Sequence, residues 1–207
     1  MISRRGTLFV VSAPSGAGKT TLCREMRLRL PDLAYSVSYT TRAPRPGEVD
    51  GADFHFVSEP RFRDMLRAGE FAEWAKVHTH LYGTPAPALE AALRDGYDVL
   101  LDIDTQGARQ LRARYPHGLF VFVVAPSMKE LELRLLERKS DAPQEISRRL
   151  GRAVEEIAAW REYDYLIVNR HLDEAVRQLA CIIEAERIRT SRLDLSLPDL
   201  DLSTDTT

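Results

Sequence analysis

Residues 13–20 hold the side chains and spacing best suited to chemistry, in the order Ala-Pro-Ser-Gly-Ala-Gly-Lys-Thr. Small residues allow successive backbone N–H groups to curl around phosphate oxygens, and a helix that starts here adds the partial positive charge of its N-terminus. Lys19 would then reach the β- and γ-phosphates of a nucleotide, and the Thr20 hydroxyl would hold Mg²⁺. The predicted phosphate loop consists of Ala13, Pro14, Ser15, Gly16, Ala17, Gly18, Lys19 and Thr20.

A glycine-rich turn that only joins a strand to a helix is the alternative for this segment. The usual pattern opens with Gly, and Ala13 is a mild departure because a small side chain is tolerated where φ is negative. The flanking sequence favours the phosphate loop, since the apolar run Thr7–Ala13 precedes it and helical spacing follows from Thr21 to Leu30. The loop alone does not identify the group that receives the phosphate.

A second pair of cations could bind another anion. Arg42 and Arg45 lie in a loop bracketed by Pro44 and Pro46. The prolines restrict the backbone, so both guanidinium groups are partly pre-aimed at a single anion. A solvated basic loop is the alternative, and the spacing taken by itself favours that alternative.

Two aspartates follow an apolar run, Val99–Leu101. They lie at the carboxyl edge, where open α/β sheets bind ligands, and carboxylates there are costly unless a cation or a donor meets them. Asp102 is therefore the candidate for the Mg²⁺ water shell. Asp104 could instead cap the helix that follows, and this role is compatible with a binding role.

Three further stretches resemble the guanylate kinase family: Ser36–Glu48, Leu101–Gly107 and Tyr163–Asn169. With the phosphate loop, the resemblance runs in order from about residue 6 to residue 190. It implies an α/β fold of the P-loop nucleoside monophosphate kinase type, with a parallel sheet flanked by helices. The implied parts are a domain at 1–190, its core at 1–34, 85–133 and 150–190, an inserted mixed α/β GMP-binding lobe at 35–84, a helical lid at 134–149, and a flexible tail at 191–207.

The resemblance also implies ATP-dependent phosphorylation of GMP to GDP, in purine nucleotide metabolism, by direct in-line transfer with Mg²⁺ as the cofactor. ATP and GMP are the expected substrates, and dGMP is a further expected acceptor. The implied GMP-binding residues are Ser38, Arg42, Arg45, Phe54, Glu73, Tyr82, Thr84 and Asp104. Arg134 and Asn169 join the phosphate loop at ATP, the metal is held by Thr20 and Asp102, and the catalytic residues are Lys19, Arg42, Arg138 and Arg149.

Glu73 also has a physical argument of its own. In Phe71–Trp74 the alternation of the strand places this carboxylate beside apolar residues. A carboxylate accepts two hydrogen bonds side by side, which suits the N1–H and exocyclic amine of guanine, whereas adenine has no N1–H. Glu73 is therefore expected to select guanine. For Ser38 and Thr84, hydrogen bonding within a strand or turn is the alternative.

The chain departs from the family pattern at two places. Phe54 stands where the family normally has a tyrosine whose hydroxyl donates to the GMP phosphate, so a donor is missing. In the lid the chain reads Leu-Glu-Arg-Lys over 136–139, where the family usually has Arg-Gly-Arg-Gly. One arginine and both glycines are absent, and Arg148 or Lys139 could take the place of the arginine.

Alternating strands and helices are expected to position these residues. Apolar runs predict strands at 7–13, 36–41, 53–58, 71–82, 99–103, 119–124 and 165–168, with Gly83 turning the chain after the fourth. Helical spacing predicts helices at 21–30, 61–69, 86–95, 106–114, 127–138 and 172–189, and a further helix that ends near 161 after an Arg-rich stretch at 138–148. This alternation is typical of a parallel sheet covered on both faces.

The bulk composition is that of a globular domain: 207 residues, 44% hydrophobic and 29% charged. A net charge of −2 lacks the basic surplus of a protein that grips nucleic acid, so no nucleic-acid partner is expected. The apolar run after Arg5 breaks at Ser12 and Pro14, too soon for a secretory signal, and no later run has the length of a membrane span. A cytoplasmic protein with no membrane partner is therefore expected.

The two cysteines, Cys23 and Cys181, are far apart in apolar helical contexts. A disulfide framework or a zinc site needs more cysteines at closer spacing, so both are expected to be buried thiols.

Two other functions fit parts of the sequence. A sugar-phosphate kinase could use the same scaffold, but Glu73 and the Arg42–Arg45 pair suit a guanine base and a phosphate. A non-catalytic interaction module of the guanylate-kinase-like kind would lack an intact phosphate loop, whereas Lys19 and Thr20 are both present.

Overall fold

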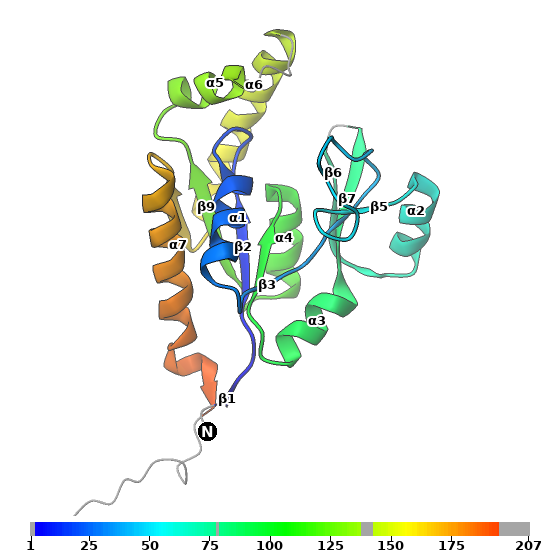
Figure 1. The fold of residues 1–207 in the computed structure, drawn as a ribbon, viewed down its shortest axis with the longest axis vertical. Coiled ribbons are helices and arrows are strands. Elements are labelled where there is room, and N and C mark those ends of the chain that lie inside the picture. Colours follow the sequence, from blue (N-terminus) through cyan, green and yellow to red (C-terminus); the bar gives the residue numbers. More distant parts are fainter. Residues whose placement is uncertain (1–2, 78, 138–142, 195–207) are drawn as a thin grey trace, which may run out of the picture.

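The computed structural model describes residues 3–77, 79–137 and 143–194 (Figure 1). Within them a parallel sheet has the strand order β10-β9-β2-β8-β3. Its strands are β2 (Leu8–Ser12), β3 (Ala34–Tyr35), β8 (Val99–Asp102), β9 (Leu119–Val124) and β10 (Tyr165–Val168). These strands are short and largely apolar, as expected for a sheet that is buried on both faces.

Helices cover both faces of this sheet. On one face, Phe9 and Val11 pack in one buried cluster with residues of α1 (Lys19–Arg29) and α7 (Leu172–Arg187). On the other face, Leu8 and Val10 pack with residues of α3 (Ala86–Arg94) and α4 (Thr105–Arg114). Successive residues of β2 thus point to opposite faces, and the doubly covered α/β fold predicted from the sequence is confirmed.

A second sheet, with the order β5-β4-β7-β6, forms the lobe beside the parallel sheet. Its strands are β4 (Tyr39–Thr40), β5 (His55–Phe56), β6 (Phe71–Val77) and β7 (His80–Pro85), and α2 (Glu59–Arg67) packs on it. Ser58 caps α2 by accepting a hydrogen bond from the Arg61 N–H. The ring of Phe62 stacks on that of Phe71 at 4.5 Å between centroids, which fixes α2 on the lobe sheet.

The prediction of one strand at 71–82 turned by Gly83 is wrong. Strands β6 and β7 form an antiparallel hairpin in which Val77 pairs with His80, and Gly83 lies inside β7 opposite Trp74. A Cβ at Gly83 would come within 2.8 Å of the Phe71 ring and 3.0 Å of the Phe62 ring. The glycine is therefore required by close packing.

The predicted strand 36–41 also differs from the structure. Only β4 falls within it, and β4 belongs to the lobe. The strand before it, β3, belongs to the parallel sheet and ends at Tyr35, so the chain leaves the core over residues 36–38. The predicted strand 53–58 is reduced to β5, because Ser58 already caps α2.

The helices α5 (Met128–Glu137) and α6 (Pro143–Ala158) lie beyond the carboxyl ends of the parallel strands (Figure 1), and η1 (Ala159–Glu162) follows them. Part of the Arg-rich stretch predicted as non-helical at 138–148 is helical, since α6 begins at Pro143. Proline has no N–H to lose in the first turn, so it suits the start of a helix. Residues 138–142 lie outside the described residues.

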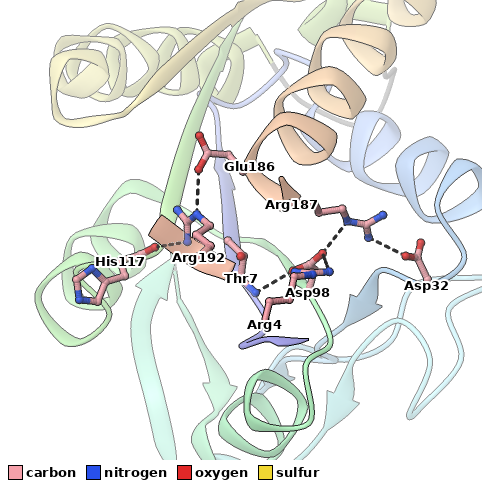
Figure 2. Close-up of polar contacts among 8 residues, drawn as sticks. All are labelled: Arg4, Thr7, Asp32, Asp98, His117, Glu186, Arg187 and Arg192. Atoms are coloured by element: carbon pink, nitrogen blue, oxygen red, sulfur yellow. Dashed lines mark hydrogen bonds and ion pairs between the residues drawn. The ribbon is translucent and has the colours of Figure 1, made fainter. Parts of the chain in front are cut away.

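The first residues of the predicted tail, 191–194, belong to regular structure. The short helix η2 (Thr190–Arg192) leads into β11 (Leu193–Asp194), which pairs antiparallel with β1 (Ser3–Arg4). Arg192 donates to the buried Glu186 carboxylate at 3.0 Å and to the His117 carbonyl at 3.1 Å (Figure 2). These contacts hold the chain against the core as far as 194, and residues 195–207 lie outside the described part.

Two smaller expectations can also be compared with the structure. Cys23 is buried in the core as predicted, but Cys181 is exposed, so the prediction of a second buried thiol is wrong. Cys181 follows the buried Leu179 and Ala180 on α7 and turns to the outer side of that helix. Over the described residues, no helix is long and apolar enough to cross a membrane.

Asp98 is the most heavily bonded buried charge at the amino edge of the sheet (Figure 2). Its carboxylate accepts hydrogen bonds from Arg4 at 2.5 and 2.8 Å, from the Arg187 Nε at 2.7 Å and from the Thr7 N–H at 2.8 Å. Burial alone would raise the pKa of Asp98, but these donors outweigh it and hold the pKa below its usual range. The network joins both ends of the described chain to the core.

We therefore expect Asp98→Ala to lower the free energy of unfolding by about 3–5 kcal/mol, because it leaves two guanidinium groups and an N–H without their acceptor. Urea unfolding at neutral pH measures this change. Arg24→Ala is the control, since it removes a solvent-exposed ion pair with Glu25 and should change stability by less than about 0.5 kcal/mol. A loss below 1 kcal/mol in Asp98→Ala would contradict the role given to the network.

Candidate active site

The predicted phosphate loop joins β2 to α1 at the carboxyl edge of the parallel sheet. Gly16 and Gly18 both have φ of +92°, a left-handed conformation that other residues rarely adopt. A Cβ at Gly18 would also lie 2.5 Å from the Asn169 side-chain nitrogen. The Asn169 amide donates to the Ala17 carbonyl at 2.8 Å and is buried. Asn169, predicted at the ATP site, thus supports the backbone of the loop.

Lys19 and Asp102, which are far apart in the sequence, form an ion pair at this edge. The Lys19 Nζ lies 2.6 Å from the Asp102 Oδ1 and donates to the Ile103 carbonyl at 2.6 Å. Burial lowers the pKa of Lys19, but the Asp102 carboxylate outweighs it and the pKa stays above its usual value. Lys19 therefore remains charged beside the loop that it would serve.

Thr20 is exposed on the first turn of α1, one residue beyond Lys19. Among the residues that the structure describes, no cluster of three or more His, Cys, Asp or Glu side chains could cage a metal ion. Mg²⁺ bound with a nucleotide usually takes one or two protein oxygens and completes its shell with phosphate and water. A hydroxyl at Thr20 and a carboxylate at Asp102 fit that donor set.

A buried carboxylate lies where the lobe meets α4. Glu73 is 5% exposed, and its Oε1 accepts a 2.6 Å hydrogen bond from the Thr84 hydroxyl on the paired strand. A Cβ at Gly107 would lie 2.3 Å from the Glu73 Oε2, so only glycine leaves room for this carboxylate. Asp104 caps α4 by accepting from the Gly107 N–H at 2.8 Å, which is the capping role considered for it.

Burial raises the pKa of Glu73 to about 7; the hydrogen bond from Thr84 opposes the shift and the nearby charge of Asp104 adds to it. A ligand with two N–H groups would add donors to this carboxyl and favour its ionised form. Ser38 lies just before β4, where its carbonyl accepts from the His55 N–H at 2.9 Å. No hydrogen bond joins Ser38 to Glu73 in the described part of the chain.

The other end of the lobe holds the predicted phosphate-binding residues. The ring of Phe54 lies 5.4 Å from the Arg42 guanidinium carbon and 5.9 Å from the Tyr82 ring. Arg42 makes a two-point ion pair with Glu48 at 2.8 and 2.9 Å, and the exposed Arg45 donates its backbone N–H to the same carboxylate at 2.7 Å. The structure thus brings Arg42, Phe54 and Tyr82 together and leaves the Arg45 side chain in solvent.

Glu48 is a functional candidate that the sequence interpretation missed. It closed the family-like stretch Ser36–Glu48, but no role was given to it. Its contact with Arg42 raises the pKa of that guanidinium and lowers the pKa of its own carboxyl. The available signal was an acidic residue that follows the two loop arginines by six and three residues.

The predicted lid contacts the predicted phosphate loop through Ser15. Arg149 on α6 donates to the Ser15 hydroxyl at 3.2 and 2.7 Å. Arg134 on α5 pairs with Glu130 at 3.0 Å and donates to the Asn169 carbonyl at 3.1 Å. Arg138, predicted to be catalytic, and Lys139, considered as its substitute, lie outside the described residues, while Arg148 lies on α6.

Comparison with known proteins agrees with this arrangement. A sequence model of the guanylate kinase family matches residues 5–186. The guanylate kinases of Geobacter metallireducens and Geobacter sulfurreducens are each 52% identical over 192 residues, which cover 93% of this chain and 95% of theirs. The chain belongs to the guanylate kinase family. The crystal structure of guanylate kinase from Anaplasma phagocytophilum superposes with a TM-score of 0.81 at 34% identity, over 99% of this chain and 97% of that one.

The Glu73 carboxyl should make stability depend on pH in a predictable direction. Folding raises its pKa from 4.5 to about 7. Between those pH values the folded protein binds more protons than the unfolded chain, so this group lowers stability as the pH rises. Glu73→Gln removes this effect. The free energy of unfolding at pH 8 minus that at pH 5 should therefore be about 2–3 kcal/mol more positive in the variant than in the wild type.

Urea unfolding of both proteins at the two pH values measures this difference. Glu25→Gln, at a solvent-facing position on α1, is the control for the loss of a carboxylate. An unchanged pH dependence in Glu73→Gln would show that Glu73 is ionised without penalty in the folded protein.

Proposed function

We propose that this protein transfers the γ-phosphoryl group of ATP to GMP and forms GDP and ADP. The observation that carries the proposal is the pairing of two sites across one edge of the sheet. A phosphate loop with a charged Lys19 lies on one side, and a buried carboxylate, Glu73, with unfilled acceptor capacity lies on the other. Asp102 and Asp104, two residues apart, connect the two sites through β8 and α4.

The base is read by Glu73. Its carboxylate accepts from the N1–H and the 2-amino group of guanine, and these donors favour the ionised form in spite of burial. Thr84 holds the carboxylate from the adjacent strand, and Asp104 and Ser38 complete the proposed base site. The proposed residues address the base and the phosphate and none addresses the ribose 2′-hydroxyl, so dGMP is a further proposed acceptor.

The phosphate of GMP is held at the opposite end of the lobe by Arg42, Arg45 and Tyr82. Glu48 already orients the Arg42 guanidinium in two-point contact, so little side-chain freedom remains to be lost when the phosphate binds. The Arg45 side chain is exposed and has to turn inward to reach the GMP phosphate. Part of the closure around GMP therefore takes place in this loop.

The GMP phosphate is the nucleophile, and its second pKa of about 6 makes it largely dianionic at neutral pH. One of its oxygens bonds to the γ-phosphorus of ATP while the bond from that phosphorus to the β–γ bridging oxygen breaks, and ADP leaves. The loop N–H groups, Lys19 and Arg149 stabilise the charge on the transferring group. Thr20 and Asp102 would hold Mg²⁺, and the bound metal would neutralise phosphate charge.

We further propose that the core, the GMP-binding lobe at 35–84 and the lid at 134–149 close over the substrates. The contact of Arg149 with Ser15 supports this for the lid, because it shows that α6 reaches the phosphate loop. Closure excludes water from the transferring phosphoryl group. Arg138 remains a proposed catalytic residue.

Lys19→Ala tests the proposal together with a choice of acceptors. ATP consumption is measured with GMP, AMP or ribose bisphosphate, and the wild type should turn over GMP far faster than the other two. Lys19→Ala should lose at least about a hundredfold in kcat, because it removes charge stabilisation from the transferring group. Lys76→Ala, an exposed lysine on the lobe, is the control. Turnover of ribose bisphosphate alone indicates the sugar-phosphate kinase, and no turnover indicates the interaction module.

Phe54→Tyr should improve the Michaelis constant for GMP by about tenfold. The added hydroxyl can donate to the GMP phosphate beside Arg42, and a hydrogen bond to a charged group contributes roughly 1.5–3 kcal/mol, of which each 1.4 kcal/mol is one decade. The turnover number should change less, since ground and transition states share this contact. Steady-state kinetics with GMP varied at saturating ATP give both constants. An unaltered KM for GMP would mean that another donor already fills this place.

A further inference from the structure

Helix α4 is joined to strand β6 of the lobe by residues from one of its faces. Gly107, Gln110 and Arg114 have the spacing i, i+3, i+7, which places them in one stripe on a helix. In Figure 1 α4 lies between the parallel sheet and the lobe. Gly107 leaves room for Glu73, and Arg114 donates to the Phe71 carbonyl at 3.1 Å.

Gln110, the middle residue of this stripe, contacts both backbone polar groups of Trp74. Its Nε2 donates to the Trp74 carbonyl at 2.7 Å, and its Oε1 accepts from the Trp74 N–H at 3.2 Å. Strand β6 stands at the end of the lobe sheet, so the outward groups of Trp74 face α4 and not another strand. The glutamine amide presents one donor and one acceptor side by side, and it pairs with this edge as a neighbouring strand would.

This contact acts on the neighbouring Glu73. The N–H that Gln110 binds belongs to the peptide group that joins Glu73 to Trp74, so the contact fixes the plane from which the Glu73 side chain projects. The β6–β7 register is irregular between Phe71 and Glu73, where the strand would otherwise be free to bend. Arg114 holds the strand before this irregularity and Gln110 holds it after.

We propose that Gln110 is a positioning residue for guanine recognition: its side-chain amide holds the peptide group after Glu73 on α4, and so aims the Glu73 carboxylate at the two adjacent N–H donors of the base. The assignment rests on the proposed function. Two parallel hydrogen bonds demand an orientation within about 10–20°, which the lobe strand alone would not provide at its free edge.

Kinetics of Gln110→Ala and Gln110→Glu, each with GMP and with IMP, test the proposal. IMP keeps the N1–H of guanine but lacks the 2-amino group, so it makes one of the two hydrogen bonds. Gln110→Glu keeps the shape of the side chain but replaces the donor with an oxygen against the Trp74 carbonyl. Gln110 is exposed, so both variants are expected to fold, and thermal unfolding verifies this.

In Gln110→Ala we expect kcat/KM for GMP to fall about tenfold, equivalent to about 1.4 kcal/mol, through a higher KM for GMP. The loss in kcat/KM for IMP should be several times smaller. A misaligned Glu73 carboxylate weakens two hydrogen bonds to GMP but only one to IMP. The KM for ATP should not change. Gln110→Glu should be impaired at least as much.

The matched control is Arg109→Ala, at the neighbouring position on α4, where the guanidinium pairs with Glu162 at 2.7 Å; among the described residues no hydrogen bond joins it to β6. It should leave the GMP-to-IMP ratio of kcat/KM unchanged. Two outcomes would overturn the proposal: unchanged kcat/KM with both nucleotides in the Gln110 variants, or equal losses with GMP and IMP, which indicate a structural effect only. A wild type that turns over neither nucleotide overturns the proposed function, and this assignment falls with it.

Discussion

The ion pair between Lys19 and Asp102 is the interaction on which the rest of the site depends. It joins the first turn of α1 to the end of β8, two elements that the parallel sheet places side by side. From Asp102 the chain runs directly through Asp104 into α4, and α4 in turn holds the lobe strand that bears Glu73. The donor loop and the proposed guanine site are therefore connected through one short segment of backbone.

Charge is balanced differently at the two ends of the lobe. At the proposed base end, Glu73 is buried and accepts a hydrogen bond from the Thr84 hydroxyl, and burial raises its pKa to about 7. At the phosphate end, Arg42 is paired with Glu48 before any ligand arrives. A buried carboxylate without enough donors is costly, and a ligand that supplies those donors recovers that cost on binding. The buried carboxyl with the raised pKa thus lies at the proposed base site.

At the amino edge of the parallel sheet, buried carboxylates have lowered pKa values. Asp98 and Glu186 are buried there, but each accepts hydrogen bonds from two arginines, and the pKa of each is held below its usual range in spite of burial. These networks hold both ends of the described chain against the core. The amino edge of the sheet thus stabilises the chain ends. The proposed chemistry lies at the carboxyl edge, where open α/β sheets bind ligands.

The sequence by itself determined the parts that follow from local pattern. The phosphate loop lies between the predicted strand and helix, and β9 and β10 have the bounds expected from their apolar runs. The cluster of Arg42, Phe54 and Tyr82 came from the family-like motifs and not from periodicity. Spacing of 2 or 3.6 residues encodes such elements because the side chains that must be buried recur within one segment.

Only the tertiary structure decided which distant groups meet. The Asn169 contact with Ala17 and the Gln110 contact with Trp74 join residues whose own neighbourhoods in the sequence do not indicate a partner. The exposure of Cys181 was decided in the same way. The local sequence pattern indicates whether a side chain is apolar or polar. Which residue it contacts depends on how the sheet and the helices pack against one another.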